Sequence, residues 1–451
     1  MVDIQGNQAM PRGTGIGRRD FIRIGALGIG GLTLTDWLGR PARGEVKPAK
    51  AKSVIQIWAG GGPSHLDTFD PKPEAGEEYC GPLKHPIATN VPGIRISELL
   101  PLLAKQADKY TIVRSFTHND GGHETAAYTV TTGHLPSGDL VYPSIGCVVS
   151  LKKGYDAGYQ GKLPPYVTVT EPIGWFSETG FLGQKYKSFN TGGDPNAPTM
   201  AVNDITPPGG VSEQRLQGRH TLRQSVDSLA RQMDQESLFQ TADALEEKAY
   251  GMILGDARKA FDLSQEKNEL REHYGRNWFG QSCLLARRLV QNGVPFITIN
   301  HGGWDTHYDN FAAIKNLVPP LDQGLAALLE DLAQTGLLSS TIVVWYGEFG
   351  RTPKIDWSGQ WKGGRHHYPF ITPLVLAGGG FRGGMVLGSS DDKGEFPKER
   401  PVRPWDLTAS IYKLLGIESN EKLPHPQGCV AYVTPLASGK VPSGGLLTEI
   451  M

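Results

Sequence analysis

Short runs of β-branched and other apolar residues recur along the chain, and a glycine-rich stretch follows most of them. Such runs are typical of strands that are buried on both faces. Between two of them, leucines recur at helical spacing at positions 321, 325, 328 and 332. This spacing predicts a helix with one apolar side. The pattern predicts strands at residues 54–58, 111–113, 165–169, 296–300, 341–345 and 371–377, and helices at 321–332 and 405–415.

The alternation of strands and helices predicts an α/β fold, with a mostly parallel central sheet covered by helices on both faces. Residues 212–290 have a different character. Leu222, Val226 and Leu229 recur at helical spacing with charged residues between them, which predicts a helical insertion or a layer of packing helices. The predicted organisation is therefore an N-terminal segment, residues 1–44, followed by one α/β domain, residues 45–451.

The composition narrows the class of protein. The chain has 451 residues, 39% of them hydrophobic, which is enough for a large core. Its formal net charge of −1 argues against a broad nucleic-acid-binding surface. The four cysteines form no CxxC pair, which excludes a cysteine-based zinc finger. After the N-terminal segment, no apolar run is long enough to predict a membrane span.

The N-terminal segment predicts export. Arg18 and Arg19 precede Phe21 and a mildly apolar, glycine-rich stretch, which matches a twin-arginine signal. That stretch is shorter than the roughly 20 residues that a membrane span requires. We therefore expect transport by the twin-arginine translocase and a periplasmic or extracellular location. The alternative is a chance pair of arginines in a flexible tail.

Histidines and acidic residues gather where the predicted strands end. Asp305 and His307 follow the strand at 296–300 within one short glycine-containing loop. A carboxylate and an imidazole two residues apart can converge on one divalent cation, at about 2.0–2.2 Å from zinc. Of the adjacent His366 and His367, one is expected to face such a site while the other points away. Eight of the twelve histidines occupy these loops: His65, His118, His123, His134, His301, His307, His366 and His367.

A donor set of imidazoles and carboxylates suits zinc best, with manganese, iron or calcium as alternatives. Glu348 follows the strand at 341–345 directly and is a further candidate ligand. The alternative for each histidine is a structural role. His301 can simply bond to the backbone, and His134 can stabilise the turn in which it lies.

Four segments, GGPSHLDTFDPKP, NHGGWDTH, GEFGRTP and GRHHYP, resemble the DUF1501 family of exported bacterial proteins. The family is of unknown function and is distantly related to alkaline phosphatases and sulfatases. The resemblance spans residues 53–416. It implies an alkaline phosphatase/sulfatase-like fold and a metal-dependent hydrolase of sulfate or phosphate esters, with a small-molecule or carbohydrate ester as substrate.

The resemblance also implies site residues. The first strand of that superfamily ends in an aspartate ligand, for which Asp67 is the nearest candidate, with His65 beside it. Asp305 and His307 resemble a two-ligand element at altered spacing, and His366 matches a histidine in a later turn. The metal ligands predicted from the residues and the resemblance together are His65, Asp67, His123, Asp305, His307, Glu348, His366 and His367.

Two departures from the superfamily pattern affect the expected chemistry. Phe349 replaces a metal-binding histidine, so a second metal is absent or held differently. Counting back nine residues from Thr132, where sulfatases place their nucleophile, reaches His123, which is neither Cys, Ser nor Thr. His123 is then a compensating ligand or a general base. Thr125 is one candidate nucleophile, and a metal-bound water with its pKa lowered toward ~7 is the preferred alternative.

Arg351, in the GEFGRTP segment, is a candidate for binding the anionic group of the substrate, because a guanidinium offers two donors to one anion. Its alternative role is an ordinary surface salt bridge. The second hypothesis for the whole chain is an exported metal-binding protein on the same scaffold without catalysis. Residues 60–62 lack the spacing of a dinucleotide-binding loop, and no G-x-S-x-G nucleophile elbow is present, which argues against other enzyme classes.

Overall fold

The computed structural model describes residues 49–136, 140–174, 178–198, 256–435 and 443–451, and a few positions between 200 and 221. Residues 49–451 form one compact unit. The predicted export signal, residues 1–44, lies outside the described residues, as does most of the predicted insertion before residue 256. No helix among the described residues combines the length and apolar character that a bilayer crossing requires.

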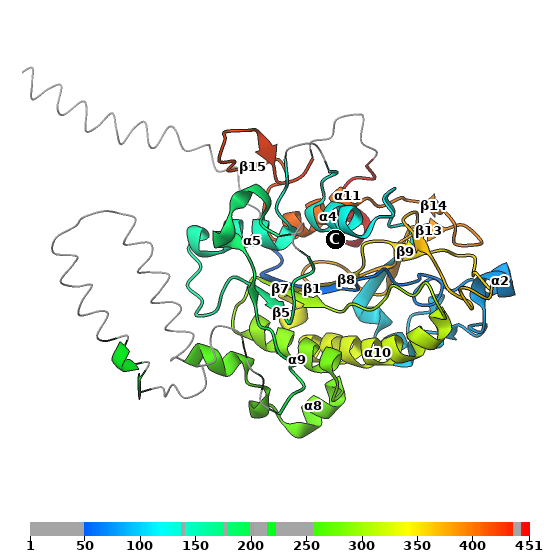
Figure 1. The fold of residues 1–451 in the computed structure, drawn as a ribbon, viewed down its shortest axis with the longest axis horizontal. Coiled ribbons are helices and arrows are strands. Elements are labelled where there is room, and N and C mark those ends of the chain that lie inside the picture. Colours follow the sequence, from blue (N-terminus) through cyan, green and yellow to red (C-terminus); the bar gives the residue numbers. More distant parts are fainter. Residues whose placement is uncertain are drawn as a thin grey trace, which may run out of the picture. The chain divides into compact units, whose positions relative to one another are not determined.

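The centre of the unit is an eight-stranded sheet (Figure 1). Seven of its strands run parallel and one, β11, runs antiparallel to both of its neighbours. The predicted α/β class with a mostly parallel sheet is therefore confirmed. The strands, in spatial order, are β12 Met385–Leu387, β4 Tyr110–Val113, β11 Leu374–Ala377, β8 Thr341–Tyr346, β1 Ser53–Trp58, β7 Phe296–Asn300, β5 Tyr166–Val169 and β6 Phe189–Asn190.

Helices cover both faces of this sheet, as the buried β-rich runs require. Along β1, Ile55 and Ile57 pack into the core on one face, whereas Val54 and Trp58 pack into a second core on the other. Figure 1 shows α8, α9 and α10 on one side and α4, α5 and α11 on the other. Their bounds are α4 His123–Thr132, α5 Ile145–Lys153, α8 Asn268–Tyr274, α9 Trp278–Gln291, α10 Asn310–Gln334 and α11 Pro404–Leu414.

The remaining regular structure consists of short pieces. The helices α2 Glu77–Cys80 and α3 Pro101–Ala104 follow β1. Four antiparallel pairs lie outside the main sheet. They are β2 Ile87–Ala88 with β3 Arg95–Ile96, β9 Gly350–Arg351 with β10 His367–Tyr368, β13 Ser389–Ser390 with β14 Pro397–Glu399, and β15 Lys422–Leu423 with β16 Ala431–Tyr432.

One helix begins earlier than its sequence predicts. The predicted helix at 321–332 is the second half of α10, which begins at Asn310 and contains Pro319 and Pro320. Prolines usually mark a first turn, because they lack the backbone N–H that an inner turn donates. Here the apolar side of the helix is buried on both sides of the prolines, at Ile314, Val318 and Leu321. Tertiary packing therefore outweighs the local preference.

Candidate metal centre

Four loops meet at one edge of the sheet, because β1, β4, β7 and β8 run parallel and end there. The loop after β4 leads into α4 at His123, the loop after β7 carries Asp305, and Glu348 follows β8. A glycine allows the loop after β1 to approach the backbone of the loop after β7 closely. Gly61 has φ +105°, and a Cβ there would lie 2.3 Å from the backbone nitrogen of Asp305. The sequence thus folds four distant segments against one another at this edge.

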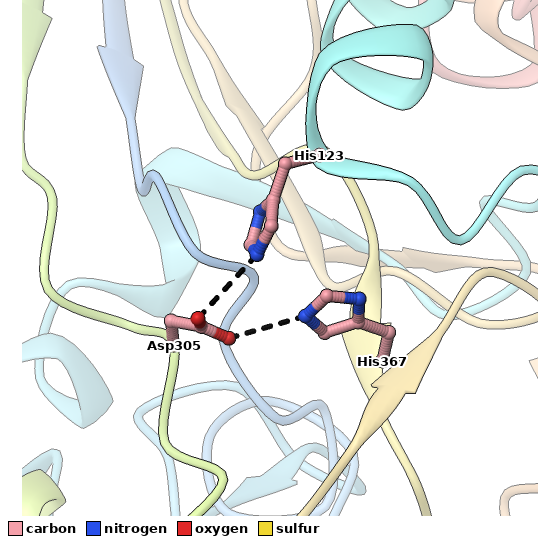
Figure 2. A group of neighbouring side chains, drawn as sticks. All are labelled: His123, Asp305 and His367. Carbon is pink, nitrogen blue, oxygen red and sulfur yellow. Dashed lines mark hydrogen bonds and ion pairs between the residues drawn. The ribbon is translucent and has the colours of Figure 1, made fainter.

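Three side chains from three of these segments converge (Figure 2). One nitrogen each of His123 and His367 and one carboxylate oxygen of Asp305 lie within 4.8 Å of one another. His123 Nε2 is 3.4 Å from Asp305 Oδ2, and His367 Nε2 is 3.2 Å from Asp305 Oδ1. His123 is the first residue of α4, whereas His367 lies on β10.

His307 extends this group. Its Nε2 lies 2.9 Å from His367 Nε2 and 3.1 Å from Asp305 Oδ1. Its other ring nitrogen, Nδ1, lies 2.9 Å from Nδ1 of His366. His366 in turn contacts Asp356 Oδ2 through Nε2, at 3.1 Å. We call His123, Asp305, His307 and His367 the His–Asp cluster; His366 stands behind it.

If all the rings are neutral, the hydrogen bonds on the far side of each ring place its proton on the nitrogen that points away from Asp305. In a neutral ring, Nδ1 of His123 donates to Glu348 Oε1 at 2.7 Å, and Nδ1 of His367 donates to the carbonyl of Gly121 at 2.8 Å, since both oxygens only accept. His366 donates through Nε2 to Asp356, so its Nδ1 accepts from Nδ1 of His307. Each imidazole of the cluster therefore presents an unprotonated Nε2 toward Asp305.

This arrangement fits a divalent cation. His307 Nε2 and His367 Nε2 face each other at 2.9 Å, and in neutral rings with the protons placed as above this contact would be relieved by a cation bound between or beside them. Three imidazole nitrogens and a carboxylate are a donor set that suits zinc. His123 and His367 are oriented by a carboxylate and a carbonyl behind them, as in established metal sites, whereas His307 is oriented by the ring of His366. The cluster is also open: 46% of the Asp305 side chain and 41% of the His123 side chain are exposed.

Glu348 is a buried residue that contacts the cluster through His123. The side chain is buried, and its Oε1 accepts hydrogen bonds from His123 and from the backbone N–H of Gly61, at 2.8 Å. Its Oε2 is buried with no hydrogen-bond partner. A buried carboxylate oxygen without a partner is costly, and cationic charge bound in the cluster would offset this cost. The hydrogen bond that His123 donates to Glu348 raises the pKa of His123 above its ordinary value, outweighing burial.

Arg351 clamps the loops together. The guanidinium is fully buried and donates to the carbonyl oxygens of Gly62 at 2.9 Å and Arg365 at 3.2 Å, to that of Gly61, and to the Asp305 carboxylate. Burial raises the pKa of Asp305, but the bond and charge of Arg351 outweigh it, and the pKa lies below its usual value. Arg351 is thus not a surface salt bridge, and it is not placed to bind a substrate anion, because it is buried and four of its five N–H groups already donate within the protein.

Three residues predicted for the site lie elsewhere. His65 is buried, with Nε2 2.8 Å from the carbonyl of Gly394, and burial lowers its pKa to about 4. Asp67 accepts from the buried Arg365 with both carboxylate oxygens, at 2.8 and 2.9 Å. Thr125 is exposed and donates to Asp120 Oδ1 at 2.8 Å. Among the described residues, none of these three side chains forms a hydrogen bond with the His–Asp cluster.

The other histidines of the strand-end loops have structural roles. His134 stacks on the ring of Tyr142, with centroids 3.6 Å apart, and His301 stacks on Phe279 at 4.1 Å. His118 bonds through Nε2 to the carbonyl of Glu348, at 2.6 Å, and so supports that residue's backbone. Burial lowers the pKa of all three, which keeps the rings neutral.

Sequence reasoning did not single out two residues that the site uses. Asp356 orients His366, and Arg365 holds Asp67 away from the cluster. Arg365 stands inside the GRHHYP segment, directly before the two histidines, which is the one signal that could have indicated it. For Asp356 no comparable signal exists, because its loop has neither apolar periodicity nor a spacing typical of ligands.

The fold and the site together define an α/β protein with a histidine- and aspartate-lined centre at the carboxyl edge of its sheet. Residues 51–441 match the sequence profile of the family described as "Protein of unknown function (DUF1501)". The chain belongs to that family. None of the curated protein sequences matches it.

Several solved structures of the alkaline phosphatase and sulfatase superfamily match distantly. The lipoteichoic acid synthase LtaP from Listeria monocytogenes is 11% identical, with 84% of this chain and 76% of that chain covered and a TM-score of 0.39. The PsFucS1 sulfatase from Pseudoalteromonas sp. is 14% identical, with 88% and 72% covered and a TM-score of 0.36. A protein in the alkaline phosphatase superfamily from Vibrio parahaemolyticus is 13% identical, with 82% and 68% covered and a TM-score of 0.37.

Proposed function

We propose that this protein is a metal-dependent hydrolase of sulfate or phosphate esters. The convergence of three unprotonated imidazole nitrogens on the Asp305 carboxylate carries the proposal. The partial exposure of Asp305 and His123 supports catalysis over a purely structural metal, because structural sites are closed by protein ligands whereas catalytic sites keep a position open.

The residues that would hold the cation are His123, Asp305, His307 and His367. When bound, a divalent cation supplies positive charge that polarises an ester oxygen and makes a nearby water more acidic. Zinc is the best match to three imidazoles and one carboxylate, and manganese and iron are the alternatives. Calcium fits less well, because it prefers oxygen ligands throughout.

The protein's own groups position these donors. Glu348 holds the proton of His123 at Nδ1 and so keeps Nε2 available. Arg351 occupies one side of the Asp305 carboxylate and fixes its orientation toward the histidines. Burial and the charge of Arg351 lower the pKa of His307, which keeps its ring neutral and able to donate its lone pair. The side chains that would hold the cation are thus already oriented before a substrate binds.

A second candidate function is a metal-binding protein without catalysis. Among the residues that the structure describes, no hydroxyl or thiol is hydrogen-bonded to the cluster, which favours this candidate: Thr125, the hydroxyl nearest in sequence to His123, donates to Asp120 instead. A hydrolase on this scaffold must therefore activate water instead of forming a covalent intermediate. Turnover measurements on metal-loaded protein separate the two candidates.

Export belongs to the proposal. The paired arginines Arg18 and Arg19 before a short apolar stretch support twin-arginine transport to the periplasm or beyond. We expect the double substitution Arg18→Lys, Arg19→Lys to retain the protein in the cytoplasm, as measured by cell fractionation. Unchanged export of that variant contradicts this part of the proposal.

The test of catalysis begins with elemental analysis of the purified protein, followed by hydrolysis of 4-nitrophenyl sulfate, phosphate monoester and phosphate diester, with and without a chelator. We expect bound metal and turnover of at least one ester. Asp305→Asn and His367→Ala should lower turnover at least about 100-fold together with metal content.

His273→Gln is the matched control. This exposed histidine of α8 contacts Glu330 and belongs to no part of the cluster. It should leave metal content and turnover unchanged. Full metal loading without turnover of any ester rejects the hydrolase and supports the non-catalytic metal-binding protein. Absence of bound metal after reconstitution rejects both.

A further inference from the structure

Phe349 packs against two histidines of the cluster and against the loop after β1. The side chain is fully buried, and the centre of its ring lies 4.3 Å from that of His367 and 5.0 Å from that of His123. The loop after β1 is equally close, because a Cβ at Gly62 would come within 2.6 Å of the Phe349 ring. An apolar ring, which offers no ligand atom, thus fills the space beside these two imidazoles.

Arg351 lies against the same ring. Its guanidinium carbon is 5.6 Å from the centre of the Phe349 ring, and the guanidinium donates to Asp305 Oδ1. A carboxylate that bridges two cations gives one oxygen to each. Here a buried side-chain cation already holds one of the two oxygens of Asp305. Arg351 therefore supplies, beside Asp305, the positive charge that a second metal ion would otherwise bring.

The donors that a second cation would need have partners elsewhere. Paired metal ions lie about 3.5–4 Å apart, and zinc takes about four ligands. Both carboxylate oxygens of Asp67 accept from Arg365, both ring nitrogens of His366 are in hydrogen bonds, and Glu348 Oε1 accepts from His123. Only Oε2 of Glu348 has no partner among these atoms, and one oxygen cannot hold a cation. Within the described part of the chain, the cluster contains the one group of at least three histidine, cysteine or acidic side chains close enough to share an ion.

We propose that the centre binds a single divalent cation, with Phe349 and Arg351 in the place of a second, and that Phe349 positions the imidazoles of His123 and His367. The outer hydrogen bond of each imidazole leaves the ring free to turn about that bond, and contact with the flat Phe349 ring fixes its plane. The inference rests on the metal binding of the proposed function, but it does not depend on ester hydrolysis.

The number of cations is measured on the full chain after its metal has been removed with a chelator and the chelator dialysed away. Calorimetric titration with zinc, and separately with manganese, should give one cation per chain, as should native mass spectrometry of the loaded protein. Two cations per chain that are both lost in Asp305→Asn overturn the proposal and leave the proposed function standing. Absence of any bound cation overturns both.

Phe349→Leu tests the positioning role. Leucine keeps the position apolar but lacks the flat face that contacts both imidazoles, so we expect the affinity for zinc to fall about tenfold in a competition titration with a chelator. Cobalt(II) bound in place of zinc has visible absorption bands that depend on coordination geometry, and these bands should shift in Phe349→Leu. A role of Phe349 in stability alone would leave both the affinity and the bands unchanged.

Phe261→Leu is the matched control. Phe261 is also a buried phenylalanine, its ring packs on that of Phe189, and it belongs to no part of the cluster. The substitution should lower the midpoint of urea unfolding but leave the zinc affinity and the cobalt bands unchanged. Equal affinities and equal spectra of the two leucine variants overturn the role of Phe349. One cation per chain without turnover of any ester sustains the single-cation centre and rejects the hydrolase.

Discussion

The ion pair between Asp67 and Arg365 provides a sharp test of the structure, because the superfamily resemblance assigns Asp67 to the metal instead. Both side chains are buried, with 1% of Asp67 and 0% of Arg365 exposed. Arg365 donates to both carboxylate oxygens and also to the carbonyls of Tyr79 at 2.6 Å and Thr352 at 2.8 Å. Asn310 donates a further hydrogen bond to Asp67 at 2.9 Å.

Arg365→Met removes the cation and leaves a buried carboxylate uncompensated. Breaking a buried pair in this way costs about 3–5 kcal/mol of the free energy of unfolding. The carbonyls that lose their donor add to this cost. Asp67→Asn leaves the guanidinium buried without its counter-charge, and we expect a loss of similar size. The double variant should lose less than the sum, since the two residues interact directly.

Urea unfolding at neutral pH, followed by circular dichroism with and without added metal, measures these losses. Lys354→Met is the matched control. It breaks the exposed ion pair of Lys354 with Glu78, whose side chains are 66% and 65% exposed, and should leave the midpoint of urea unfolding nearly unchanged. The reasoning is refuted if Asp67→Asn unfolds at the same urea concentration as the unmodified protein but has lost its metal. Asp67 would then be a ligand.

Three further predictions concern the site and its surroundings. Glu348→Gln should weaken metal affinity about 10–100-fold in a competition titration with a chelator, because it orients His123; unchanged affinity contradicts that role. Gly61→Ala should lower both stability and metal content, since its Cβ would meet Asp305, whereas Gly93→Ala, with φ +84° and nothing within 4 Å, should affect stability alone. Burial lowers the pKa of His134 to about 4 from 6.5, so its neutral form contributes stability that is complete above pH 6.5 and is lost as the pH falls toward 4. The loss is about 3 kcal/mol, and unfolding curves of His134→Phe should show a correspondingly weaker dependence on pH over that range.

The fold was largely predictable because its strands are buried on both faces. Runs such as residues 54–58 and 341–345 have few residues that tolerate water, so their position in a covered sheet follows from hydrophobicity. The start of α10 was not predictable in this way. From the local sequence, Pro319 and Pro320 indicate that the helix begins at the prolines. Only the burial of Ile314 and Phe311 against the rest of the protein explains why the helix begins earlier.

The candidate site, like the fold, has a part that was predictable from the sequence and a part that was not. Asp305 and His307 are close in sequence, so their proximity in one loop was predictable from spacing alone. The role of Asp67 was not, because its partner Arg365 is 298 residues away. The choice between His366 and His367 likewise depends on β10: its pairing with β9 turns His367 toward Asp305 and leaves His366 to contact Asp356. Sequence spacing contains no information about such register.

The groups behind the cluster influence which ring nitrogens face Asp305 without a proton. An imidazole can present either nitrogen, and at a site without fixed partners the three rings would adopt whichever tautomers minimise repulsion. Here Glu348, the carbonyl of Gly121 and the Asp356–His366 pair each hold a proton on the outer side of a ring. In neutral rings, the inner nitrogens of His307 and His367, 2.9 Å apart, are thereby left without a proton. A protein that only needed three histidines near one another would gain nothing from this arrangement, whereas one that binds a cation gains affinity from rings that need no reorganisation.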